Sequence, residues 1–170
     1  WRFMDALQQL GGETWFRLGG SDLAMHVERT RRLEAGEPLS AVTRSLAARL
    51  GVRPSVIPMS DARVSTMVLT DEGDLAFQEY FVARGFRPPV RGVRFEGIEA
   101  ARPAPGVAEA LASCDLVVLC PSNPWVSLDP ILSVPGLRPA VREKPTVGVS
   151  SIVGGKAVRG PAAKMFIEMG

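Results

Sequence analysis

Hydrophobic and polar positions follow a helical period in the first third of the chain. Residues 21–36 and 39–51 place apolar side chains at helical spacing, and each segment ends at a glycine. This pattern predicts two amphipathic helices. Ser21 or Asp22 is the expected N-cap of the first helix and Ser40 that of the second, because short polar side chains accept hydrogen bonds from free backbone N–H groups.

The middle of the chain alternates with the period of a β-strand. "RVSTMVLT" and "LAFQEYFV" flank the turn sequence "DEGD", which predicts a hairpin whose glycine takes a positive φ. "PVRGVRFEG" predicts a further strand. "SVIPM", residues 55–59, predicts a short strand at a sheet edge, since Pro58 cannot donate to a ladder. Residues 107–114 return to a helical pattern.

Two nearly unbroken apolar runs, "LVVLC" at 116–120 and "TVGVS" at 146–150, lie further along the chain. Such runs are typical of parallel strands buried between helix layers. The segment 121–145 is long enough for a helical crossover, and its helix is expected to begin at Asp129–Pro130. We therefore predict a single α/β domain over 1–170, with a doubly wound, Rossmann-like, mainly parallel sheet and an inserted antiparallel hairpin.

Composition narrows the protein class further. With 46% hydrophobic and 22% charged residues and a net charge of +2, the chain has the profile of an ordinary globular protein, and its scattered arginines do not indicate a nucleic-acid partner. The longest apolar stretches are too short to span a membrane. Cys114 and Cys120 lie about 20 Å apart if their run is extended, too far for a disulfide. Free thiols in a buried strand predict a cytoplasmic location.

The two ends of the chain differ from the polar, poorly ordered ends of most domains. It begins inside the amphipathic segment "WRFMDALQQLGG" and stops at "KMFIEMG", directly after a helical pattern. We expect it to be truncated at both ends, as a piece of a longer protein.

Two polar loops follow the apolar runs and are the strongest candidates for a binding site. Parallel strands end at the same rim of a sheet, where α/β proteins bind ligands. Hydroxyl, amide, glycine and cationic groups in these loops could hold an anion or a nucleotide. The alternative is that the glycines and prolines only build turns around solvated cations; neither loop is a P-loop or a GxGxxG motif. The candidates are Ser122, Asn123, Ser150, Ser151, Gly154, Gly155, Lys156, Arg159, Gly160 and Lys164.

Other polar residues carry two interpretations each. Local sequence favours a helix cap for Asp22, whereas Asp61 suits an Asx-turn or a Mg²⁺ ligand equally well. His26, the only histidine, is more typical of a helix face than of a lone catalyst. Arg17, just before a Gly-Gly turn, is placed to face a ligand. Trp125 suits ring stacking and core packing alike.

Several blocks, in order, resemble the 2-phospho-L-lactate transferase family of coenzyme F-420 biosynthesis, whose actinobacterial relatives are phosphoenolpyruvate transferases. They include "WFRLGGSDLAMHVERT", "IPMSDARVSTMVLTDEGDLAFQEYFV", "VVLCPSNPWVSLDPILSVPG" and "VGVSSIVGGKAVRGPAAKM". The resemblance runs from about residue 13 to residue 170. It implies an enzyme that moves a phospho-lactyl or phosphoenolpyruvyl group from a guanosine diphosphate-activated donor to the ribityl hydroxyl of the deazaflavin precursor Fo. GMP leaves, Mg²⁺ is required, and homodimers are the family's tendency.

The resemblance also implies roles for particular residues. Arg17 falls where the family has a basic residue that contacts the deazaflavin. The loops containing Ser122, Asn123, Ser150, Gly154, Gly155 and Lys164 correspond to nucleotide and phosphate contacts. Asp22 and Asp61 are the expected catalytic carboxylates, which orient the hydroxyl or the metal, with Asp61 as the metal ligand.

The sequence departs from the family pattern beside both carboxylates. Gly20 and Ala62 stand where acidic residues are usual, and the family's opening Gly-rich loop and last quarter have no counterpart here. Two alternatives therefore accompany the transferase. One is a nucleotide-sugar-binding regulator of the gluconeogenesis-factor-like family, against which the "PSNPWVSL" loop argues. The other is an inactive fragment of the transferase.

Overall fold

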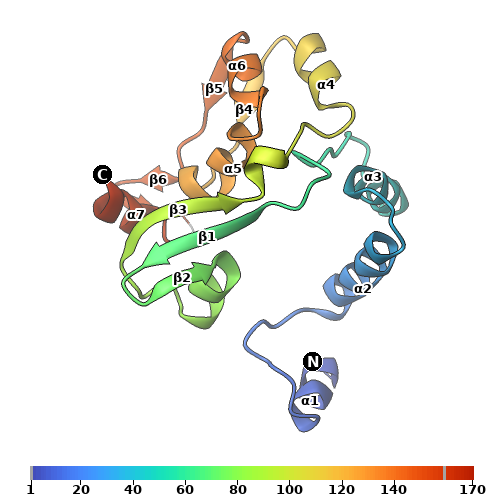
Figure 1. The fold of residues 1–170 in the computed structure, drawn as a ribbon, viewed down its shortest axis with the longest axis vertical. Helices are drawn as coiled ribbons and strands as arrows, with labels where there is room; N and C mark the ends of the chain where they lie inside the picture. The colour runs from blue at the N-terminus through green and yellow to red at the C-terminus, as the bar shows by residue number, and fades with distance from the viewer. Residues whose placement is uncertain (1, 159) are drawn as a thin grey trace. The chain divides into compact units, whose positions relative to one another are not determined.

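The structure, a computed structural model, describes residues 2–158 and 160–170 (Figure 1). These form two compact units, the first ending at Pro58 and the second spanning Met59–Gly170. The first unit holds three helices: α1 (Arg2–Gln9), α2 (Gly20–Glu34) and α3 (Leu39–Arg49). The second holds β1 (Ser65–Thr70), β2 (Gly73–Ala76), η1 (Glu79–Ala83), β3 (Val90–Glu96), η2 (Ile98–Ala100), α4 (Val107–Ser113), β4 (Val117–Leu119), η3 (Pro124–Leu128), α5 (Asp129–Leu132), α6 (Leu137–Arg142), β5 (Thr146–Gly148), β6 (Ile152–Val153), β7 (Lys156–Ala157) and α7 (Ala162–Met169).

The two helices expected in the first unit are confirmed. The backbone at Gly36 turns left-handed, with φ of 85°, and closes α2 with hydrogen bonds to the last carbonyls. The expected caps are wrong, because Gly19 and Pro38 occupy the N-cap positions. Each helix thus begins slightly earlier than the polar residues suggested, and Ser40 is buried within the first turn of α3.

A three-stranded antiparallel sheet of order β2-β1-β3 organises the second unit. The hairpin is confirmed, and Gly73 takes the expected positive φ, at 111°. Its second strand ends at Ala76, however, and the following residues form a π-helical turn, η1. Phe77 and Phe81, four positions apart, stack with centroids 5.6 Å apart, while Tyr80 is fully buried. The period of these aromatic side chains is helical, so the expected long strand was wrong.

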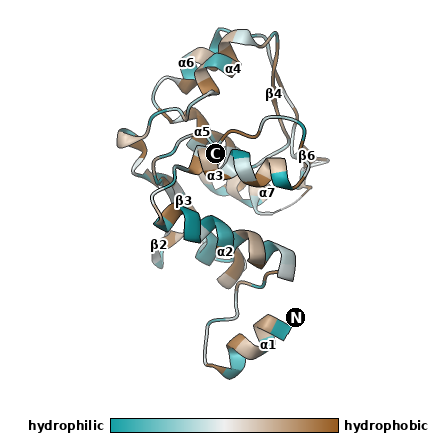
Figure 2. Ribbon diagram, turned by 90° about the vertical axis from the view of Figure 1, so that its right-hand side faces the viewer, coloured by the Kyte–Doolittle hydropathy of each residue, from teal (hydrophilic) through white to brown (hydrophobic). Residues whose placement is uncertain are grey.

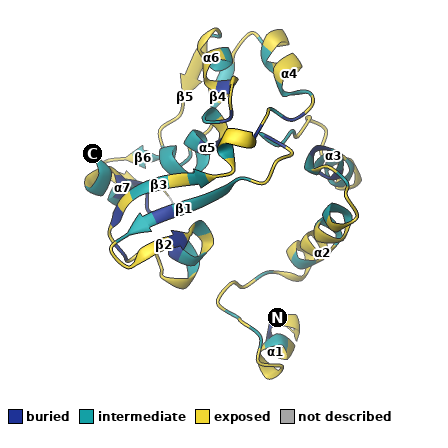
Figure 3. Ribbon diagram, viewed as in Figure 1, coloured by how far each residue is buried: buried dark blue, intermediate teal, exposed yellow. Residues whose placement is uncertain are grey.

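The main core lies where helix α7 meets this sheet. Its buried members are Val68, Leu75, Tyr80, Val90 and Met165. Figure 3 shows the dark blue buried positions on β1, β2 and α7. Met165 is the contribution of α7 and has no exposed surface. The burial of apolar area here is the chief force that fixes α7 on β3.

Strands β4 and β5 form the expected parallel pair, in the register Val117↔Thr146, and η3, α5 and α6 form the expected crossover between them. The expected burial on both faces is wrong. Val118 and Val147, which are paired in register, each remain 52% exposed. Figure 2 shows the hydrophobic colour along β4. A two-stranded sheet has too few neighbours to cover both faces.

Other expectations meet mixed outcomes. The segment 55–59 forms no strand. The residue that follows it, Ser60, makes an isolated β-bridge with Pro103. Pro58, within the segment, has no N–H to donate to a ladder. Cys114 and Cys120 are free thiols, but Cys120 is exposed rather than buried. The mixed α/β class is confirmed. The expected predominance of parallel pairing is wrong for the described strands, because the hairpin and β3 pair antiparallel and only β4 and β5 pair in parallel.

Candidate functional site

The loops that follow β4 and β5 lie side by side. Parallel pairing brings the carboxyl ends of the two strands together, and Val149 N–H extends the ladder by donating to the Leu119 carbonyl at 3.0 Å. Beyond that point the Ser151 hydroxyl donates to the Ser122 carbonyl oxygen at 3.1 Å. The prediction that both loops share one rim of the sheet is therefore confirmed.

Asn123 shapes the first loop as the N-cap of η3. Its Oδ1 accepts hydrogen bonds from the backbone N–H groups of Trp125 at 3.0 Å and Val126 at 3.4 Å. Pro124, at the first helical position, has no N–H to satisfy. The α-helix α5 begins at Asp129, as expected, but the π-helical turn η3, which begins at Pro124, precedes it directly. The Asn-Pro pair was the signal, since a polar cap followed by proline is a frequent helix start.

The second loop folds into a small hairpin. The Ser150 hydroxyl accepts from the Ile152 N–H at 3.0 Å, and β6 then pairs with β7. Gly154 and Gly155 form the tip, with φ of 57° and 76°, the left-handed pair that a type I′ turn needs. The glycines therefore build a turn, as one of the two interpretations had it, and their contact with an anion stays a prediction. Lys156 is exposed, and Arg159 lies outside the described residues.

Lys164 lies in the first half of α7 with its ammonium group fully engaged. Its Nζ donates to the Pro88 carbonyl at 2.8 Å, to Glu168 Oε2 at 2.7 Å and to the Tyr80 hydroxyl at 3.5 Å. An ammonium has three donors. A phosphate contact from Lys164, as predicted, would therefore require one of these bonds to be exchanged.

The two titratable groups that bond to Lys164, Glu168 and Tyr80, have shifted pKa values. Burial alone would raise the pKa of Glu168, but hydrogen bonds from Lys164 and from the Val90 N–H outweigh it, and the net pKa is lowered. Burial raises the pKa of the Tyr80 hydroxyl, and the neighbouring Lys164 charge offsets part of that rise. Glu168 is therefore the ionised partner of Lys164 at neutral pH.

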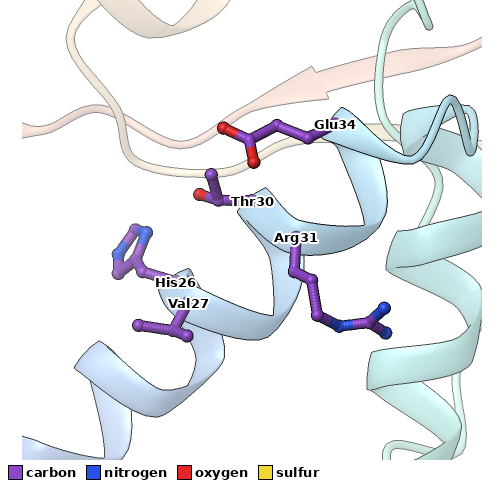
Figure 4. A pocket seen from close by; sticks show the side chains of 5 residues that line it. All are labelled: His26, Val27, Thr30, Arg31 and Glu34. Atoms are coloured by element: carbon purple, nitrogen blue, oxygen red, sulfur yellow. The ribbon is translucent and has the colours of Figure 1, made fainter.

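The first unit contains three of the candidates, all exposed: Arg17, Asp22 and His26. Asp22 lies inside the first turn of α2, not at its cap, and its charge complements the helix dipole there. His26 helps line a hollow on α2. Figure 4 shows its side chain on the same side of the helix as those of Thr30 and Glu34. The other lining residues are Val27 and Arg31.

Asp61 is an exposed carboxylate just before β1. It lies within a turn made by Ser60, which is buried and whose hydroxyl accepts from the Ala62 N–H at 3.1 Å. Within residues 2–158 and 160–170, no three His, Cys, Asp or Glu side chains gather as a metal-binding group. Any cation at Asp61 would thus take most of its ligands from substrate and water, which is how Mg²⁺ often binds.

A search of the described helices found none long and apolar enough to cross a membrane.

Comparisons with known proteins match nearly the whole chain. A family profile described as 2-phospho-L-lactate transferase CofD matches residues 2–170. The 2-phospho-L-lactate transferase of Methanopyrus kandleri is 46% identical over 165 residues, covering 96% of this chain and 53% of that protein. The phosphoenolpyruvate transferase of Streptomyces griseus subsp. griseus is also 46% identical, covering 94% of this chain and 52% of its own length. The chain thus spans about half the length of these relatives.

The fold is also found among solved structures. Two crystal structures of a UPF0052-family protein from Bacillus halodurans align with TM-scores of 0.51 and 0.53, each at 19% identity. They cover 63% and 66% of this chain, and 34% and 36% of their own. This similarity concerns the fold alone.

Proposed function

The chain belongs to the 2-phospho-L-lactate transferase CofD family, and we propose that it carries part of the active site of a transferase in coenzyme F-420 biosynthesis. The proposed donor is a guanosine diphosphate-activated three-carbon acid, and the proposed acceptor is the deazaflavin precursor Fo. Both a phospho-lactyl and a phosphoenolpyruvyl donor remain in the proposal, because relatives named for each transfer are equally identical, at 46%.

In the proposed reaction the terminal ribityl hydroxyl of Fo attacks the distal phosphorus of the donor. A new phosphorus–oxygen bond forms, and the bond to GMP breaks with its electron pair leaving on the GMP oxygen. The hydroxyl proton passes to a base. Such reactions are accelerated mainly by alignment and by stabilisation of charge. The chain therefore has to hold two substrates in line and need not supply a nucleophile.

The donor's guanine nucleotide and phosphates are assigned to the two loops at the ends of β4 and β5. The observation that carries this assignment is the hydrogen bond from Ser151 to Ser122, which joins the loops at one rim. Hydroxyl and backbone N–H groups can bind phosphate oxygens in such a position. The residues assigned to the donor are Ser122, Asn123, Ser150, Gly154 and Gly155.

The acceptor and the proton transfer are assigned to charged groups. Arg17 is the proposed contact to the deazaflavin. Asp22 and Asp61 are the proposed carboxylates that orient the hydroxyl or the metal. They also accept the proton of that hydroxyl. All three side chains are exposed, so a substrate can reach them.

Mg²⁺ is the proposed metal, with Asp61 as its protein ligand. One exposed carboxylate fits this ion, because Mg²⁺ in phosphate sites takes one or two carboxylates and completes its shell with water and phosphate oxygens. When bound, Mg²⁺ supplies neutralisation of negative charge on the donor's phosphates. Asp61 would hold it at the surface, beside the turn that Ser60 fixes.

We further propose that β4 and β5 are neighbouring strands of a doubly wound sheet in a cytoplasmic protein. The parallel pairing and the helical crossover between the strands support this arrangement. The free thiols of Cys114 and Cys120 suit a reducing compartment.

A binding titration followed by turnover tests the proposal. Fo is titrated by its own fluorescence into the intact protein with Mg²⁺ and GDP, beside Arg17→Ala and the matched control Arg53→Ala, another exposed arginine of the first unit. We expect saturable binding that Arg17→Ala weakens about tenfold, the loss typical of one charge-assisted hydrogen bond, and that Arg53→Ala leaves unchanged. The donor should then yield GMP. A folded, intact protein that neither binds Fo nor releases GMP would refute the proposal.

A further inference from the structure

Helix α7 is attached to the first loop on one of its sides. Met165 has no exposed surface, and its sulfur accepts a hydrogen bond from Asn123 Nδ2 at 3.2 Å. The neighbouring Phe166 ring meets Trp125 edge to face, with centroids 4.5 Å apart. Since Asn123 also caps η3, the position of α7 and the shape of the first loop depend on the same side chain.

Charged hydrogen bonds attach the same helix to the start of β3. Lys164 and Glu168, one turn apart, bond to each other at 2.7 Å. Lys164 also bonds to the Pro88 carbonyl at 2.8 Å, and Glu168 Oε2 accepts from the Val90 N–H at 2.9 Å. Both side chains are more than two-thirds buried, at 28% and 23% exposure, which strengthens such bonds relative to a surface pair.

The second loop leads directly into α7. The hairpin β6–β7 ends at Ala157, and α7 begins at Ala162, so few residues separate them. At Gly160, between them, the chain runs so close to Phe81 that an added Cβ would lie 3.4 Å from the ring, and its φ is +70°. A displacement of α7 would therefore be passed to the hairpin at its N-terminal end and to Asn123 at its side.

We propose that α7 is a bracket that holds the two donor-binding loops in register, and that Lys164 and Glu168 are positioning residues that fix this bracket on β3. This inference rests on the proposed function for the identity of the donor. It assigns Lys164 a role different from the phosphate contact expected from its sequence position. Its ammonium already makes three hydrogen bonds, and moving it to a phosphate would leave the largely buried Glu168 carboxylate without its cation.

The two roles of Lys164 predict different results when its partner is changed. A phosphate ligand is lost in Lys164→Met, whereas Glu168→Gln keeps the ammonium and spares donor binding. A positioning pair is lost equally in either variant, and the double variant is no worse than each single one, because either change breaks the Lys164–Glu168 bond on which the attachment of α7 to β3 depends. Lys144→Met is the matched control: Lys144 Nζ bonds to the carbonyls of Ala112 and Cys114, away from α7.

The experiment measures donor KM, kcat and backbone hydrogen exchange in the intact protein for these variants. We expect Lys164→Met, Glu168→Gln and the double variant each to raise donor KM about tenfold, the effect of losing one charge-assisted hydrogen bond, with kcat changed less. Amide exchange in residues 120–128 and 150–158 should quicken by a similar factor. Lys144→Met should leave both the KM and the exchange of these segments unchanged.

Three outcomes overturn the bracket. They are a KM effect confined to Lys164→Met, unchanged exchange in both loops, or equal effects from Lys144→Met. Hydrogen exchange needs no substrate, so it tests the bracket even if the wild-type protein proves to transfer nothing. Failure of the proposed function, by contrast, shows as absent turnover in the wild type while the loops still respond to Lys164→Met.

Discussion

Replacing Asn123 by alanine should destabilise the second unit by a predictable amount. The side chain makes two kinds of contact: Oδ1 caps η3 at 3.0 and 3.4 Å, and Nδ2 donates to Met165 Sδ at 3.2 Å. Loss of an N-cap costs about 1 kcal/mol. The weaker bond to sulfur adds about 0.5 kcal/mol, at the low end for a neutral hydrogen bond. Asn123→Ala should therefore lower the free energy of unfolding by about 1.5 kcal/mol.

Asn123→Asp separates the two contributions. A carboxylate keeps the cap and places a negative charge at a helix N-terminus, where it is favourable, but it removes the donor to Met165. We expect a cost of about 0.5 kcal/mol or less for this variant. Comparing the two variants therefore assigns the difference to the cap.

Urea unfolding measures these costs. The chain has three tryptophans, so a background in which Trp125 is the only one makes fluorescence report on the capped turn itself. Circular dichroism and fluorescence should show the same unfolding midpoint for the second unit. The slope of the unfolding free energy against urea concentration should be the same for wild type and variants. The reasoning fails if Asn123→Asp costs as much as Asn123→Ala, or if neither variant costs more than about 0.5 kcal/mol, the range expected of a neutral surface change.

Three further predictions concern the second unit. Val68→Ala, at a fully buried core position, should cost about 2 kcal/mol in thermal or urea unfolding, and a near-neutral result would contradict the assigned core. Gly155→Val, at a φ of 76°, should cost about 1–2 kcal/mol, whereas Gly154→Asn, which suits the first position of a type I′ turn, should cost little. Because the folded pKa of Glu168 is below its ordinary value of 4.5, its stabilisation is complete above that pH and is lost as pH falls through the lower folded pKa. The free energies of unfolding of wild type and Glu168→Gln, measured against pH, should thus converge in acid. Curves that stay parallel would disprove the link between Glu168 ionisation and stability.

The sequence predicted the elements whose signals are local. Gly36 stops helix α2 just beyond its last residue, Glu34, and Gly73 makes the β1–β2 turn, because in each case a glycine supplies a left-handed backbone that few other residues adopt. The parallel pairing of β4 with β5 followed from two short apolar runs separated by a crossover. The shared rim of the two loops followed from that pairing alone.

The errors arose where one short pattern fits two structures. "FQEYFV" is rich in the aromatic residues that strands favour, but Phe77, Tyr80 and Phe81 have the i, i+3, i+4 spacing of a helix, and the packing of Tyr80 into the core agrees with the helical turn. The start of η3 was missed because two Pro-containing signals, at Pro124 and Pro130, competed for one helical segment. Cys120 was expected to be buried, but exposure depends on which neighbours cover a strand.

By itself, then, the sequence determined the family resemblance, the mixed α/β class and the two loops that form the candidate donor site. The surroundings of Lys164 were decided only by the tertiary structure. Its partners are Tyr80 of η1, Pro88 in the loop before β3 and Glu168 of α7, and only Glu168 is near in sequence. A lysine in a glycine-rich segment has the same local sequence whether it binds a phosphate or a carboxylate. The choice depends on distant groups that folding brings within reach, and a pattern of neighbouring residues carries no record of them.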